Sequence, residues 1–227
     1  MNTMKTITMP SARNQHLSGL LTVLAASLIT GCSDPSEQVH KTAGAEPRKA
    51  AETASAGKEY VIRAESTIGF IGSKVTGKHD GGFRKFAGKF SVAGGKIAGS
   101  PEIKIAMAST WSDNEKLTGH LKSPDFFDAA KFPTSTFTVT GIEAAGAKQT
   151  VTGNLDLHGV TKSISFPADI QITDDAVTVK AEFAINRKDF NINYPGRPND
   201  LIRDNVVLKL DLQATPGEPR PEDQLGK

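Results

Sequence analysis

The sequence predicts an all-β fold: an antiparallel, lipocalin-like barrel of about eight strands with a short helical insertion between strands. Three observations support this. Apolar and polar residues alternate with a period of two through most of residues 60–212. Turn-forming residues separate these runs, which follow one another at spacings of roughly 8–12 residues. Only residues 112–130 break the rhythm with a segment that could form a helix.

The alternating runs give the expected strands in chain order. They lie at residues 60–64, 68–75, 83–90, 103–107, 136–139, 151–157, 164–172, 177–185 and 206–212. Residues 77–82 (GKHDGG) are expected to form a polar turn. Each strand has one apolar and one polar face, so one side of each strand faces water. A closed barrel of this size either fills its interior with side chains or holds one slim ligand.

Residues 1–31 have the features of a lipoprotein signal peptide. Lys5 and Arg13 supply positive charge, and residues 17–29 form an apolar run that is too short to span a bilayer. The run ends in ITGC, which resembles a lipobox whose cysteine, Cys32, becomes the acylated N-terminus. Cys32 is the only cysteine, so no disulfide is expected in the mature chain.

Acylation would decide the location of the protein. Two or more acyl chains give stable membrane attachment, so we expect an extracytoplasmic, lipid-anchored protein of the periplasm. Ser33, rather than an aspartate, follows Cys32, which favours the outer membrane. Residues 32–58 are polar and predict a flexible linker, residues 59–214 form the barrel, and residues 215–227 predict a disordered tail.

The charge balance excludes one class of partner. The chain carries 27 basic and 25 acidic residues, and residues 1–31 contain two of the bases and no acid. The mature chain is therefore balanced at 25 of each. Because nucleic-acid-binding domains carry a basic face, no nucleic-acid partner is expected.

Several sequence blocks occur in an order typical of one family. They are residues 66–70 (STIGF), 79–88 (HDGGFRKFAG), 120–137 (HLKSPDFFDAAKFPTSTF), 152–162 (TGNLDLHGVTK), 185–190 (INRKDF) and 202–206 (IRDNV). Together they resemble the YceI family of periplasmic proteins, whose lipocalin-like barrels bind polyisoprenoid lipids. Two departures are Asn191, where the family often has glycine, and residues 111–116 (WSDNEK) before the longest block.

The resemblance implies a binding protein that sequesters or carries a long-chain apolar amphiphile, a polyisoprenoid or an isoprenoid quinone. It implies no enzymatic activity, and no cofactor apart from a bound isoprenoid-type lipid. A homodimer stays possible. Two alternatives from other classes are an enzyme acting on a small hydrophobic substrate and a structural envelope protein with a filled barrel.

Aromatic side chains are the main candidates for contact with such a ligand. All 11 phenylalanines lie in the part of the chain expected to fold. Periodicity alone does not separate a filled barrel from a lined cavity, and the resemblance favours the cavity. The predicted ligand-binding residues are Phe70, Phe83, Phe86, Phe90, Ile105, Met107, Leu121, Phe126, Phe127, Phe137, Leu155, Phe166, Phe183 and Ile185.

Polar residues of the same blocks are assigned to turns and to the barrel rim. Asp125 and Asp128 could be paired catalytic acids, but a role in fixing the turn near Phe126 and Phe127 is favoured. Arg187 is expected to pair with Asp189 or Asp204, or to meet a polar ligand head. His79, His120 and His158 lack the spacing of metal ligands, so no metal site is expected. The predicted rim residues are His79, His120, Asp125, Asp128, Arg187 and Asp204.

Overall fold

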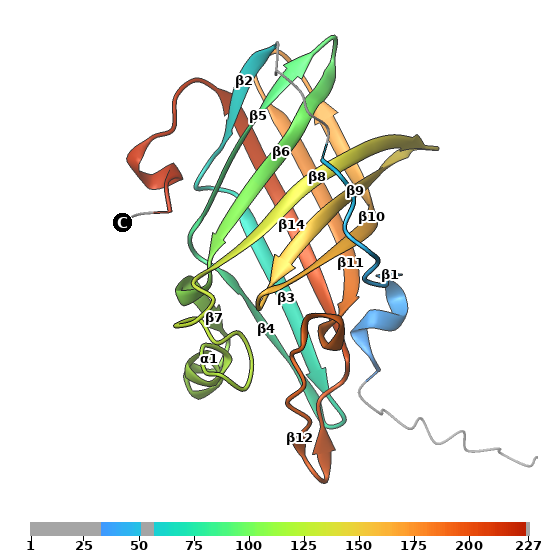
Figure 1. Ribbon diagram of the computed structural model, residues 1–227, viewed down its shortest axis with the longest axis vertical. Helices are drawn as coiled ribbons and strands as arrows, with labels where there is room; N and C mark the ends of the chain where they lie inside the picture. Colours follow the sequence, from blue (N-terminus) through green and yellow to red (C-terminus); the bar gives the residue numbers. More distant parts are fainter. Residues whose placement is uncertain (1–32, 51–56, 226–227) are drawn as a thin grey trace, which may run out of the picture. The chain divides into compact units, whose positions relative to one another are not determined.

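The computed structural model describes residues 33–50 and 57–225 (Figure 1). The predicted signal peptide and Cys32 lie outside these residues. The predicted barrel is confirmed: eight antiparallel strands close on themselves in the order β11-β10-β9-β8-β6-β5-β2-β14, with β14 pairing back to β11. These strands are β2 (Lys58–Ile62), β5 (Phe86–Ala93), β6 (Lys96–Ala106), β8 (Thr134–Ala145), β9 (Lys148–Leu157), β10 (Val160–Ile172), β11 (Val177–Asn186) and β14 (Asn205–Pro216).

The first strands of the barrel bend and continue past its rim. β3 (Thr67–Lys74) continues β2, because β14 pairs first with β3 and then with β2 along one edge. β4 (Gly77–Phe83) pairs with β3, and β7 (Thr110–Ser112), which follows the 3-10 turn η2 (Met107–Ser109), pairs with β4. The β3–β4 hairpin therefore projects beyond the closed barrel at its lower end (Figure 1).

β4 corrects the sequence-based prediction, which placed a polar turn at residues 77–82. These residues pair in register with β3 from Lys74 to Gly69. Residues 77–82 have the composition of a turn because two of their glycines, Gly81 and Gly82, leave room for the neighbouring rings of Phe70 and Trp111. A Cβ at Gly81 would lie 2.4 Å from Cζ of Phe70. Glycine is therefore needed here for close approach and not for a turn.

The predicted helical insertion contains one short helix. α1 (Glu115–Leu121) begins after Asn114, whose side chain accepts a hydrogen bond from the Leu117 amide at 3.0 Å. The chain after α1 runs in tight turns instead of continuing the helix to residue 130. The carbonyl of Ser123 accepts from the amides of Phe126 and Asp128, and the Leu121 carbonyl accepts from the Phe127 amide.

The segment before β2 forms part of the barrel wall. The 3-10 turn η1 (Pro35–Gln38) leads into β1 (His40–Thr42), which pairs in parallel with residues 183–185 of β11. Ala45 then exchanges two backbone hydrogen bonds with Ser163 of β10. β10 and β11 pair with each other only at residues 169–172 and 177–180, so this segment closes the gap where the two strands separate. We call residues 33–50 the strap.

The strap differs from the flexible linker that was predicted for residues 32–58. Its composition offers little apolar surface, and polar contacts hold it in place. The Gly44 amide donates to Asp189 Oδ2 at 2.8 Å, and Arg48 exchanges hydrogen bonds with the Asn154 side chain. Asp34 pairs with Arg203 at 3.4 Å.

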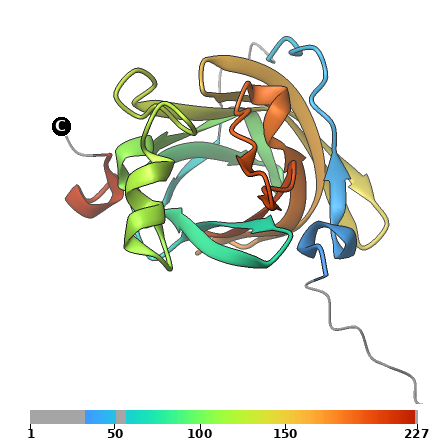
Figure 2. The same ribbon diagram turned by 90° about the horizontal axis from the view of Figure 1, so that it is seen from below.

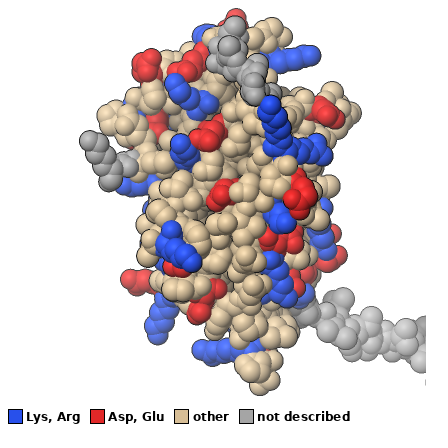
Figure 3. Space-filling view, in the orientation of Figure 1, with Lys and Arg blue, Asp and Glu red and all other residues tan. Residues whose placement is uncertain are grey.

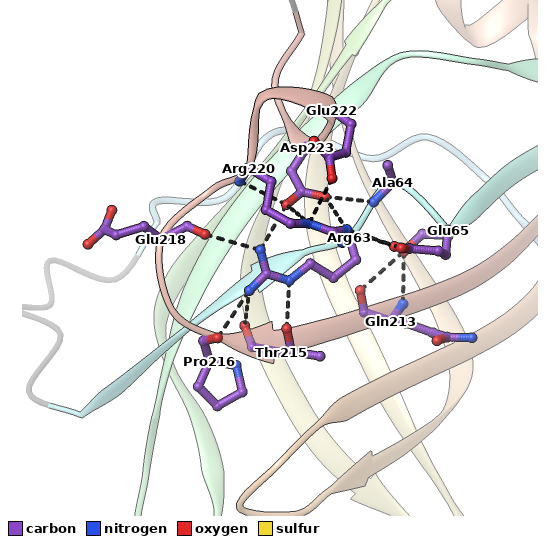
Figure 4. A network of polar contacts seen from close by, with 11 residues as sticks. Arg63, Ala64, Glu65, Gln213, Thr215, Pro216, Glu218, Arg220, Glu222 and Asp223 are labelled. Carbon is purple, nitrogen blue, oxygen red and sulfur yellow. Dashed lines mark hydrogen bonds and ion pairs between the residues drawn. The ribbon is translucent and has the colours of Figure 1, made fainter.

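The C-terminal residues also differ from the predicted disordered tail. β14 extends to Pro216, and the chain then folds back through the 3-10 turn η4 (Pro221–Asp223) onto the β2–β3 corner (Figure 4). The side chain of Asp223 is fully buried and lies 2.8 Å from Arg63 and 2.9 Å from Arg220. The Ala64 amide donates to its other oxygen at 2.9 Å. An ion-pair network therefore fixes a segment whose composition is typical of disorder.

The hydrophobic core occupies the barrel interior. Phe166 and Phe183 stack with their centroids 3.9 Å apart, and Phe190, which is 0% exposed, packs in the same cluster. Among the described residues, no helix has the length and hydropathy needed to cross a bilayer.

Candidate ligand-binding cavity

A cavity of about 170 Å³ lies inside the barrel. Its walls are apolar apart from Ser135 and Arg187. The strands supply them by simple alternation, because every second residue of β9, β10, β11 and β14 points inward. Eleven of the predicted ligand-binding residues line it: Phe70, Phe83, Ile105, Leu121, Phe126, Phe127, Phe137, Leu155, Phe166, Phe183 and Ile185.

A second interior space of about 70 Å³ adjoins the cavity. The two spaces share five wall residues, so the rings of Phe137 and Phe166 lie between them together with three aliphatic side chains, Ile103, Leu210 and Leu212. The two rings lie 5.7 Å apart. Phe90, which was predicted to contact ligand, lines this second space. Phe86 and Met107 are buried in the core and stand outside the cavity lining.

Phe137 owes its position to a glycine on the neighbouring strand. Gly153 stands next to it in the β8–β9 pairing, and a Cβ at Gly153 would lie 2.4 Å from Cζ of Phe137. Any side chain at Gly153 would push the ring away from β9. The bare glycine therefore sets how far Phe137 extends into the interior.

A wider space of about 450 Å³ lies at the lower end of the barrel, and we call it the mouth. The mouth shares five lining residues with the cavity, and these form the boundary between the two: Phe70, Gly72, Leu121, Phe126 and Ile202. It lies between α1 and the hairpin of β12 (Gly196–Arg197) and β13 (Asp200–Leu201). Figure 2 shows both elements at this end of the barrel, seen from below.

The mouth carries the polar groups that the cavity lacks. Its lining includes Lys74, His79, His120 and Arg197. Ser73 also lines it, is 6% exposed, and has no hydrogen-bond partner for its Oγ among the described residues. A buried hydroxyl without a partner is costly, and a polar group bound in the mouth would remove that cost.

The rings of the helical insertion sit at the cavity boundary. The Phe126 ring packs edge-on against His120, with centroids 4.9 Å apart, and at a tilt against Tyr194, with centroids 5.3 Å apart. Phe127 packs against Phe70 at 6.3 Å and Phe83 at 5.8 Å. Phe126 and Phe127 of the insertion thus pack with rings from α1, β3 and β4 at the lower end of the barrel.

The predicted rim histidines and acids form separate pairs. His120 Nε2 lies 2.7 Å from Asp125, and His79 Nδ1 lies 2.8 Å from Asp113. Burial raises the pKa of Asp113, but hydrogen bonds from His79 and the Asp80 amide outweigh it, so the pKa lies below its ordinary value.

Asp128 acts in the turn through its backbone, as the favoured turn role expects. Its backbone adopts a positive φ of 43°, and its carbonyl accepts hydrogen bonds from the Lys131 and Phe132 amides. Among the described residues, no three His, Cys, Asp or Glu side chains lie close enough to hold a metal ion.

Arg187 is buried and serves mainly as a donor to the backbone. It is 4% exposed and donates to the carbonyls of Ile192 at 2.6 Å and Arg203 at 3.1 Å. It also pairs with Asp204 at 3.3 Å, whereas Asp189 holds the strap instead. Burial lowers the pKa of Arg187, and Asp204 opposes this effect. Arg187 lines the cavity, and its hydrogen bonds to Ile192 and Arg203 hold together the two ends of the segment that carries the β12–β13 hairpin beside the mouth.

The sequence-based prediction missed some lining residues. Alternation along the strands could have identified Ile103, Leu157, Val206, Leu208 and Leu210. Ile192 and Ile202 also line the cavity, and Tyr194 lines the mouth. These three lie in the irregular segment between β11 and β14, where no period indicates which side chains face inward.

Residues 60–214 match the YceI-like domain family. The chain belongs to this family. A UPF0312 protein of Pseudomonas putida strain F1 is 31% identical over 156 residues, which cover 63% of this chain and 81% of the relative. One from Pseudomonas syringae pv. tomato is 32% identical over 163 residues, covering 66% of this chain and 85% of the relative.

Solved structures support the same fold for this YceI-like domain. BcnA of Burkholderia cenocepacia is 26% identical, with a TM-score of 0.60 over 67% of this chain and 98% of that protein. A polyisoprenoid binding domain from Saccharophagus degradans is 20% identical, with a TM-score of 0.58 over 70% of this chain and 98% of that one. The family assignment expected from the sequence blocks is confirmed.

Proposed function

We propose that this YceI-like protein binds a long-chain apolar amphiphile, a polyisoprenoid or an isoprenoid quinone, with the tail in the cavity and the head in the mouth. The observation that carries the proposal is the meeting, across Phe70, Leu121 and Phe126, of an almost wholly apolar cavity with a mouth that adds charged and polar side chains. The Saccharophagus degradans protein with this fold is described as a polyisoprenoid binding domain, which supports the same ligand class.

The tail of such a ligand has no polar groups, and the cavity offers almost none. Each methylene moved from water into an apolar wall contributes about 0.8 kcal/mol, before the cost of ordering the chain. Lys74, Arg197 and the free Ser73 hydroxyl would meet the head at the other end. This division between the two ends selects amphiphiles over small polar substrates.

The size of the cavity determines what must move on binding. A cavity of about 170 Å³ is comparable to one that holds a single benzene ring. Drug-sized ligands occupy pockets of roughly 300–1,000 Å³. A long tail therefore requires the Phe137 and Phe166 rings to rotate and join the second space to the cavity.

Anchoring and location complete the proposal. Cys32, the only cysteine, follows the apolar run and the residues ITG, which favours acylation and a place at the periplasmic face of a membrane. The absence of Asp directly after Cys32 favours the outer membrane. An anchored carrier would exchange its lipid with the bilayer that holds it.

Native mass spectrometry of the protein purified from the cell envelope tests the ligand. We expect a population heavier than the bare chain by the mass of an isoprenoid lipid, and organic extraction should release that lipid for identification. A protein that carries no lipid, and that takes up neither a polyprenyl phosphate nor a ubiquinone when these are added, would refute the proposal.

A further inference from the structure

The lower end of the barrel exposes two large aliphatic side chains. Val75 is 57% exposed and Leu201 is 50% exposed, and no other large hydrophobic residue of the described chain is exposed. They are neighbours, because the Val75 amide donates to the Leu201 carbonyl at 3.2 Å. Val75 follows β3 and Leu201 ends β13, in the two hairpins that project furthest below the barrel (Figure 1).

The two hairpins are tied together. Lys74 forms an ion pair with Asp200, and Thr76 Oγ1 donates to the same carboxylate at 2.9 Å. Lys74 also forms a β-bridge with Ile202. These contacts fix the two hairpins to each other, and with them the positions of Val75 and Leu201.

Basic side chains accompany the apolar pair. Lys78 and Arg197 are exposed on the same hairpins, and neither has an ion-pair partner within the described part of the chain. A groove of about 300 Å³ beside Val75 and Leu201 is lined by further charged residues: Arg187, Lys188, Arg203 and Asp204. In Figure 3 the lower tip is uncharged surface with basic side chains beside it. Apolar tips flanked by bases fit the interface of an anionic bilayer, where each base contributes roughly 1 kcal/mol.

The position of the strap supports the same orientation. Asp34 pairs with Arg203, whose amide donates to the Ser73 carbonyl at the mouth. Asp34 is two residues after Cys32, and two residues span at most about 7 Å. An acylated Cys32 would thus hold this end of the barrel close to the bilayer, a step that rests on the proposed function.

We propose that Val75, Leu201, Lys78 and Arg197, which we call the tip, dock on an anionic phospholipid bilayer. Val75 and Leu201 enter the interface, and the two bases contact lipid phosphates. Lys74, Arg197 and Asp200 belong to the lining of the mouth, so docking turns the mouth toward the membrane. A lipid then passes between bilayer and cavity without crossing water.

Site-specific fluorescence tests the docking. All described strands and the whole core lie within residues 33–225, so a chain of residues 33–227 retains the folded body and has no cysteine. An environment-sensitive dye on Val75→Cys should shift to the blue and become protected from iodide with vesicles of phosphatidylcholine and phosphatidylglycerol. The same dye on Ala147→Cys, in the β8–β9 turn, should not respond. Equal responses, or none at either position, would overturn the proposal.

Vesicle flotation gives a second readout. Val75→Glu with Leu201→Glu should lower the fraction bound to these vesicles about tenfold or more, since two apolar contacts are lost. Lys78→Glu with Arg197→Glu should remove the preference for phosphatidylglycerol. The matched control, Ala145→Glu with Ala147→Glu at the other end, should bind as the parent does. A dye response that appears without vesicles and rises with protein concentration would show that a second copy, and not a membrane, covers the tip.

The two proposals fail separately. The Val75→Glu, Leu201→Glu variant changes no residue that lines the cavity or the mouth, so it should keep any lipid bound in the barrel, as read by native mass spectrometry. Lipid bound in the barrel without a response at Val75 would refute docking alone. Docking by a protein that never binds a lipid would refute the proposed function alone.

Discussion

Phe137 and Gly153 together set the volume of the cavity. The ring packs against the bare backbone of β9 at Gly153, and Phe137 is shared by the cavity and the second space. A single methyl group at Gly153 would therefore change the space available to a ligand by displacing the Phe137 ring.

Gly153→Ala should push Phe137 into the cavity, lower the amount of bound lipid, and reduce the free energy of unfolding by about 1–3 kcal/mol. Lipid content by mass spectrometry and denaturant unfolding measure the two effects. The matched control is Gly141→Ala in β8, where an added Cβ meets nothing within 4 Å. Adding Phe137→Leu to Gly153→Ala should restore stability. If Gly153→Ala lowered stability and Phe137→Leu did not restore it, the destabilisation would not come from contact with the Phe137 ring.

At the scale of elements, the strap has a role that its composition conceals. It pairs with β11, bridges to β10 and contacts β9, so it completes the barrel wall over Phe183 and Ile185, which line the cavity. The contact between Gly44 and Asp189 fixes the point where it turns.

Asp189→Ala should release the strap near Gly44. Amide hydrogen exchange in residues 40–48 should become faster, and the protein should lose roughly 1–2 kcal/mol of stability because one charge-assisted hydrogen bond disappears. Asp169→Ala on β10 is the control, since Asp169 is exposed. Unchanged exchange in the strap after Asp189→Ala would mean that the β1–β11 pairing alone holds it.

The insertion after α1 is the other element that defines the site. It brings Phe126 and Phe127 to the end of the barrel, while backbone hydrogen bonds fix its turns. Asp125 pairs with His120, which packs on the Phe126 ring. Asp125 therefore helps to position the Phe126 ring through His120, while Asp128 acts in the turn through its backbone.

At the scale of the whole molecule, ion pairs at both chain ends make stability depend on pH. Hydrogen bonds from Arg220 lower the pKa of Asp223 far below its ordinary value of 3.8, against the opposing effect of burial. Hydrogen bonds from Ser36, with the charge of Arg203, outweigh burial and lower the pKa of Asp34. Both carboxyls bind protons less readily in the folded chain than in the unfolded chain.

The free energy of unfolding should therefore be constant above about pH 5 and fall as the pH drops below the unfolded pKa. Asp223→Asn should cost roughly 2 kcal/mol at neutral pH and flatten this acid dependence, because the buried carboxylate loses its charge. Denaturant titrations at several pH values measure both effects. Glu222→Gln, at an exposed partner of Arg220, should behave as the parent does. Equal acid sensitivity in the Asp223 and Glu222 variants would assign the effect to other carboxylates.

The sequence by itself determined the family, the barrel and most of the wall of the cavity. Alternation with a period of two identifies inward-facing residues such as Phe166 and Phe183, because a strand places every second side chain on one face. The signature block located the insertion and its two rings. These features depend on local patterns, which the order of residues records directly.

Only the tertiary structure decided the strap, the docked C-terminal segment, β4 and the composition of the mouth. Each depends on contacts between residues far apart in the chain, such as Gly44 with Asp189 and Arg63 with Asp223. The two terminal segments are held by polar contacts and bury few apolar side chains. Their composition therefore resembles that of a disordered chain. The glycines of β4 make room for Phe70 and Trp111, so a paired strand has the composition of a turn.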